Sequence, residues 1–284
     1  MIRGIDFGSV ADALSRAPLW PIAIAATLGF GIIACKAIAW RILLGAEYPV
    51  PIPRLINYTV TSYAGSVLLP LRAGELLRLW LLRDRDGVPV TRSAAVAMAE
   101  KLLDIVSMLL VVAPLPWLVD GLPASVGRWI AALAVAVAVA LIMLRLVAAR
   151  LSRASWVGRI VDAMSVIQRP RVFVATVAVL VVSWLIDLAM VGLVMCSVGI
   201  DGSIGSGLLV LFAINVSIAI PTTPGQLGAL ELGAMIGLDL VGVSREASLA
   251  FAVLYHALQA IPTVIAGLAL NARLVVSRTP EQSR

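Results

Sequence analysis

Three charged residues that could do chemistry lie inside an otherwise apolar stretch of the chain, namely Glu100, Lys101 and Asp104. A helix that begins near Val90 would carry them roughly 15–20 Å along its axis, close to the centre of a bilayer. Charges at that depth are costly in free energy, so they must face other helices or a watery cavity, and they mark functional sites. Glu100 and Asp104 would share one helix face, and a closed Lys101–Asp104 ion pair is the structural alternative.

A second set of residues, Arg72, Gly74, Glu75 and Arg78, lies in the segment LRAGELLRLWLLRDRDG, which is too charged to face lipid. We expect a helix over 71–85. The two arginines and the free N–H groups of its first turn could clamp a phosphate, because a guanidinium offers two parallel donors. The structural alternative is a ladder of ion pairs within this helix, with Glu75 between the two arginines. Pairing of either arginine with the first set would join the two sets.

A third set lies in the segment PTTPGQLGALE, at a break between two short apolar pieces. Thr223 is predicted to cap a helix whose first residue is Pro224, since the missing N–H is harmless there. Gly225 and Gly228 allow a headgroup or another backbone to approach, and Glu231 follows one turn later. A helix that starts at membrane depth offers N–H groups and a positive dipole end to an anion. A plain Pro-Gly turn is the alternative.

Two further ionisable residues, Asp187 and His256, are placed in or near the membrane. The single histidine could titrate in a proton-coupled cycle, although a lone histidine beside residues such as Tyr255 and Gln259 is more often a packed polar contact. No cluster with metal-ligand spacing and no nucleophile with a nearby base stands out. We therefore expect no enzyme activity, no metal and no cofactor.

The composition explains what must position these residues. The chain is 61% hydrophobic and 13% charged, with a mean hydropathy of +1.02, whereas about a quarter of the residues of a soluble domain are charged. The net charge of +6 is carried by arginines at span ends, and Lys36 and Lys101 are the only lysines. Such placement suits membrane topology and anionic lipid better than nucleic acid. The predicted fold class is all-α, a polytopic bundle of membrane helices.

The expected elements are long apolar spans, shorter apolar pieces and amphipathic segments. The spans are 18–40, 93–119, 128–148, 172–198 and 246–270, the shorter pieces are 54–70, 205–220 and 225–242, and the amphipathic segments are 1–17 and 149–171. Arginines crowd 145–171 and the C-terminal tail, and 172–244 contains no lysine or arginine. The positive-inside rule therefore places the tail in the cytoplasm.

With this orientation, 205–242 must dip in from outside and return, because each arm is too short to cross comfortably. The same reasoning makes 54–86 a hairpin that dips in from the cytoplasm and puts the N-terminus outside; a full crossing by 54–70 is the alternative. The residues 88–99 and 241–252 match at six of their positions, and both follow a hairpin. Inverted repeats with short broken segments are typical of transporters.

We therefore expect one integral membrane domain over 1–284, made of two inverted repeats. Its parts are an interfacial segment (1–17), a first repeat (18–125), a connecting span with a cytoplasmic connector (126–171), a second repeat (172–276) and a cytoplasmic tail (277–284).

Three motifs in this order resemble a known family. They are Pro70…Gly74-Glu75…Arg78, Glu100-Lys101…Asp104 and Pro221-Thr-Thr-Pro-Gly225…Gly228…Glu231. The pattern is similar to that of the transmembrane region of lysylphosphatidylglycerol synthases and its stand-alone relatives, with Lys101 where the family usually has arginine. The best-known members flip aminoacylated phosphatidylglycerol and carry a soluble transferase domain. No such domain is found within 1–284, so the resemblance does not imply synthase activity.

The resemblance and the charged sets together favour a lipid transporter or flippase in a bacterial inner membrane. Its substrate would be an anionic lipid, either a phospholipid or a polyprenyl phosphate, and the three motif sets would bind the headgroup. The main alternative is an accessory subunit of a membrane glycosyltransferase or of a lipid-modifying pathway, such as hopanoid metabolism. A membrane enzyme or a second copy of the chain are the expected protein partners.

Overall fold

The computed structural model describes residues 6–69, 73–148, 164–219 and 223–276. Over these ranges the fold is all-α, and no strand is formed. Four helices are long and apolar enough to cross a membrane, at Leu19–Leu44, Ala124–Met143, Pro170–Ser197 and Arg245–Asn271. The chain is therefore a polytopic helical membrane protein, as its composition predicts.

The helices follow the predicted order with small shifts at their ends. They are α1 (Phe7–Ser15), α2 (Leu19–Leu44), α3 (Ile52–Leu68), α4 (Gly74–Asp86), α5 (Val90–Val112), α6 (Leu115–Leu118), α7 (Ala124–Ala148), η2 (Ser165–Gln168), α9 (Pro170–Ser197), α10 (Ile204–Ser217), η3 (Pro224–Gln226), α11 (Ala229–Asp239) and α12 (Arg245–Val276).

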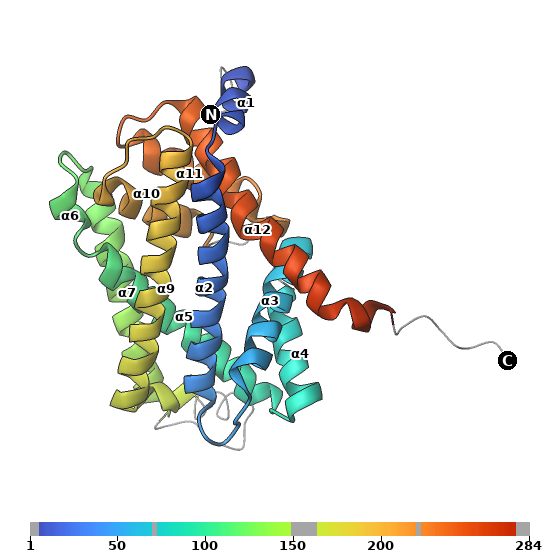
Figure 1. Cartoon of the computed structure of the whole chain (residues 1–284). Coiled ribbons are helices and arrows are strands. Elements are labelled where there is room, and N and C mark those ends of the chain that lie inside the picture. The colour runs from blue at the N-terminus through green and yellow to red at the C-terminus, as the bar shows by residue number, and fades with distance from the viewer. Residues whose placement is uncertain (1–5, 70–72, 149–163, 220–222, 277–284) are drawn as a thin grey trace.

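The long helices α2 and α9 pack side by side through the middle of the bundle, and α5 packs against α9 (Figure 1). The α3–α4 hairpin stands at the end of the bundle where α2 finishes and α9 begins. The α10–α11 hairpin stands at the opposite end, where α2 begins and α9 finishes. The first half of the chain thus consists of α2, the α3–α4 hairpin and α5. The second half consists of α9, the α10–α11 hairpin and α12.

Glycines allow the two helices of each hairpin to pack closely against each other. A Cβ atom on Gly74 would collide with the backbone of Ser62 and Ser66, so only glycine lets α4 lie this near α3. A Cβ atom on Gly233 would lie 2.6 Å from the Cα atom of Ile214 and would separate α11 from α10. The close approach of backbones through small residues is the usual way in which helices pack tightly in membranes.

The three most exposed tryptophans among the described residues lie at one end of the bundle, whereas Trp80 of α4, 49% exposed, lies away from them. Trp20 lies at the start of α2, Trp117 in α6 and Trp129 near the start of α7, and their side chains are 62%, 82% and 63% exposed. These three elements meet the same end in Figure 1. Amphipathic indole rings prefer the headgroup level of a bilayer, so this end is a natural membrane boundary.

Candidate functional site

Lys36 of α2 is the centre of the charged cluster. Its Nζ atom lies 2.5 Å from Asp104 Oδ1 and 3.4 Å from Glu100 Oε1. Glu100 and Asp104 are one turn apart on α5 and both face α2, as their spacing predicts. Sequence reasoning left Lys36 out of the site. The available signal was a single cation within a long apolar span, since such a charge needs an intramembrane partner.

Two indole rings complete the binding of these carboxylates. Trp40 Nε1 donates to Glu100 Oε2 at 2.8 Å. Trp184 Nε1, from α9, lies 3.1 Å from both the Oδ1 atom and the backbone oxygen of Asp104. Each carboxylate of α5 therefore contacts the same ammonium and its own indole donor. Such partners offset the large free energy that removal of a charge from water costs.

Arg78 brings a second cation into the cluster from α4. Its Cζ atom lies 4.3 Å from the ring centroid of Trp40 and 5.8 Å from that of Tyr63, a cation–π arrangement. Its Nη1 atom lies 4.0 Å from Glu100 Oε2, which confirms that the α3–α4 hairpin and α5 share one cluster. The side chain is only 4% exposed, yet Nη1 has no hydrogen-bond partner in the described part of the chain. A buried donor without an acceptor is rare in proteins and needs an explanation.

Lys101 does not form the ion pair with Asp104 that we considered. Its Nζ atom lies 3.3 Å from Glu75 Oε1 instead, and both side chains are partly exposed. The reason is geometric, because Lys101 leaves α5 about 100° away from Glu100 and so faces α4. The ladder of ion pairs within α4, given above as the structural alternative for Glu75, involves Arg72 as well as Arg78. Arg72, the other arginine of that ladder, lies outside the described residues.

The described residues of the charged cluster carry a net charge of zero. Among the described residues its three cations and three carboxylates balance, so the site is not an excess of positive charge. The cations are Lys36, Arg78 and Lys101, and the carboxylates are Glu75, Glu100 and Asp104.

The break in the second half is built differently from the prediction. Thr223 does not cap a helix that begins at Pro224, because its Oγ1 donates to the carbonyl of Leu227 at 2.6 Å. Residues 224–226 form a short 3-10 turn with positive φ at Gly225 and Gln226, and α11 begins only at Ala229. Two successive left-handed residues cannot continue a right-handed helix.

Glu231 holds this break together. Its Oε2 atom accepts a hydrogen bond from the Gly228 backbone N–H at 2.7 Å, and Oε1 lies 2.7 Å from His256 Nδ1 on α12. One of the N–H groups at this helix start, that of Gly228, therefore already has an acceptor. A Cβ atom on Gly225 would lie 3.3 Å from the carbonyl oxygen of Val67, so this turn meets the end of α3. The two hairpins thus approach each other at their tips.

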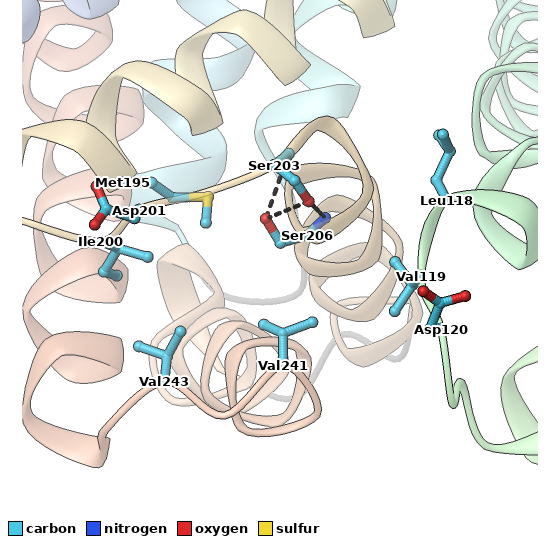
Figure 2. A pocket seen from close by; sticks show the side chains of 10 residues that line it. All are labelled: Leu118, Val119, Asp120, Met195, Ile200, Asp201, Ser203, Ser206, Val241 and Val243. Carbon is cyan, nitrogen blue, oxygen red and sulfur yellow. Dashed lines mark hydrogen bonds between the residues drawn. The ribbon is translucent and has the colours of Figure 1, made fainter.

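A pocket of about 280 Å³ lies elsewhere in the molecule (Figure 2). It opens where the α6–α7, α9–α10 and α11–α12 connections come together, and Asp120 and Asp201 lie on opposite sides of it. Ser203 and Ser206 on its wall bond to each other. None of the site residues predicted from the sequence lines it.

The architecture is that of a helical membrane protein with a largely buried ion-pair network among α2, α4 and α5. A family model described as the lysylphosphatidylglycerol synthase transmembrane region matches residues 1–267. The chain belongs to this family, as its motifs indicated. No curated protein matches the sequence.

Proposed function

We propose that this chain is a lipid transporter of the flippase type, which moves a lipid with an anionic, phosphate-bearing headgroup between the two leaflets of a bacterial inner membrane. The observation that carries the proposal is the Arg78 guanidinium, which is 4% exposed and keeps one donor without an acceptor among the residues that the structure describes. Membership of a family of transmembrane regions supports it at a coarser level.

The Arg78 site suits a phosphate by its chemistry. A phosphate oxygen accepts the strong charge-assisted hydrogen bonds that a guanidinium donates. Trp40 stacks on the guanidinium and also binds Glu100, so the free donor is held in one orientation. Lys101, partly exposed beside Glu75, would add a second cation at the mouth of the site. The residues would bind and release a headgroup, and the proposal includes no catalysed bond change.

The arrangement of the hairpins supports a route for the headgroup. We place the arginine-rich end, with the α3–α4 hairpin and the C-terminus, in the cytoplasm according to the positive-inside rule. The α3–α4 hairpin would then dip into the membrane from inside and the α10–α11 hairpin from outside, as in an inverted repeat. Alternate opening at the two hairpins would expose the site near Arg78 to each leaflet in turn.

The test is translocation of a fluorescent phospholipid in proteoliposomes that contain the purified chain. Arg78→Ala should lower the rate at least tenfold, and Arg78→Lys should restore only part of it, because an ammonium lacks the planar fork. The matched control is Arg83→Ala, on an exposed position of the same helix, which should leave the rate unchanged. An unchanged rate in a folded Arg78→Ala protein would refute the proposal. Absence of translocation by the wild type, together with stable co-purification of a membrane enzyme, would support an accessory subunit instead.

A further inference from the structure

Asp187 is a carboxylate in the middle of α9 without a cationic partner in the described part of the chain. Its contact is with Tyr255 of α12, whose hydroxyl donates to Asp187 Oδ1 at 2.7 Å. Tyr255 is 1% exposed and stacks on Phe251 with ring centroids 5.6 Å apart. Asp187 itself is half-buried in the bundle. Inside a membrane span a charged carboxylate needs a cation or a proton to offset the loss of water.

The neighbouring helices supply too little positive charge for Asp187. It interacts electrostatically with Lys36 of α2 and with Asp104 of α5. However, Lys36 already contacts both Glu100 and Asp104. The same ammonium therefore interacts with three carboxylates, and Asp187 is the one that it does not contact directly.

The other groups near this region are engaged elsewhere. Arg78 contacts Glu100, Lys101 contacts Glu75, and His256, next to Tyr255 on α12, contacts Glu231. The helices α10 and η2, which also pack against α9, contain no titratable residue.

A phosphate headgroup at Arg78 would add a further negative charge to this cluster. Excess negative charge in a medium of low dielectric constant favours the binding of a proton by the carboxylate that has the weakest cationic compensation. By this criterion that carboxylate is Asp187, since Glu100 and Asp104 each contact Lys36 and an indole donor.

We propose that Asp187 is a proton-binding site, and that binding of a phosphate headgroup at Arg78 is linked to uptake of one proton by its carboxylate. This inference rests on the proposed function. The proton comes from water and converts the carboxylate to the neutral acid, and no other bond changes. Because linkage is reciprocal, the proton must strengthen headgroup binding by the same factor by which the headgroup strengthens proton binding. Release of the lipid would then release the proton.

The experiment measures binding of short-chain phosphatidylglycerol to the purified full-length chain as a function of pH. The phosphodiester of this lipid keeps one negative charge throughout, so a change in affinity reports on the protein. For the wild type we expect the affinity to rise as the pH falls, by up to about tenfold per pH unit where one proton is taken up. Asp187→Asn should bind the lipid with little dependence on pH. The control Asp120→Asn, at an exposed loop position, should behave as the wild type.

A measurement of proton uptake and two further variants distinguish the possible outcomes. Proton uptake on lipid addition, followed with an indicator in weakly buffered solution, should approach one per lipid in the wild type and disappear in Asp187→Asn. The inference is wrong if the wild type takes up no proton, or if His256→Gln abolishes the pH dependence while Asp187→Asn retains it. Equal binding by the Arg78→Ala protein and the wild type would instead refute the proposed function, so the two failures can be told apart.

Discussion

Glu100→Gln should make the chain bind a phosphate headgroup more tightly. In the structure Glu100 competes with any incoming anion for Arg78, since its Oε2 atom lies 4.0 Å from Arg78 Nη1. Two unit charges at that separation attract each other by about 4 kcal/mol at an effective dielectric constant of about 20. Glutamine removes this attraction and the repulsion between Glu100 and a phosphate, while its side-chain oxygen can still accept from Trp40.

The net gain in affinity should be smaller than this Coulomb energy, because Lys36, 3.4 Å from Glu100 Oε1, already neutralises part of the carboxylate charge. We expect roughly a tenfold lower Kd, or about 1.4 kcal/mol. Tighter binding mostly slows dissociation, so translocation in proteoliposomes should become slower although binding improves. A variant with better binding and poorer transport would identify Glu100 as the group that keeps headgroup binding reversible.

The assay is a binding isotherm of short-chain phosphatidylglycerol to the purified chain, accompanied by a thermal unfolding curve. Asp104→Asn is the matched control, because Asp104 contacts Lys36 and Trp184 and has no contact with Arg78. It should lower Kd by less than Glu100→Gln does. An unchanged or raised Kd for a Glu100→Gln protein that unfolds as the wild type does would refute the reasoning.

Two stability predictions follow from the same contacts. Lys36→Met leaves Asp104 inside the bundle without its ammonium partner, and loss of one member of a buried ion pair costs about 3–5 kcal/mol; a fall in Tm in detergent checks this, and an unchanged Tm would contradict it. Gly74→Ala introduces a Cβ atom where the backbone of Ser62 lies, whereas the same change at Gly29 meets no atom within 4 Å. The Gly74 variant should therefore unfold at a lower temperature than the Gly29 variant, and equal values would show that the hairpin tolerates separation.

The positions of the helices were predictable because each long apolar run must satisfy its backbone hydrogen bonds within itself when lipid surrounds it. The shared face of Glu100 and Asp104 followed from helical spacing in the same way. The cation that pairs with these carboxylates could not be predicted from helical spacing. Lys36 is 68 positions away from Asp104 in the chain, and only the packing of α2 against α5 brings them together.

At the break between α10 and α11, the capping signal in the sequence predicted the wrong helix start. Thr223 and Pro224 form a common helix start, and a capping rule considers only the residues next to it. The structure instead uses Glu231 to bind the Gly228 N–H and His256 together. This arrangement depends on a contact between α11 and α12 and was therefore not visible from the motif alone.

The approach of the hairpin tips has an electrical consequence. The turn at Gly225 meets the backbone of Val67 from the opposite end of the bundle. Under the proposed function, water follows each hairpin inward from its own side of the membrane, and the insulating layer shrinks from about 30 Å of hydrocarbon to the contact between the two tips. The membrane voltage then drops mainly across that contact, where a unit charge gains or loses about 2.3 kcal/mol per 100 mV. A charged headgroup would cross nearly the whole voltage in one short step.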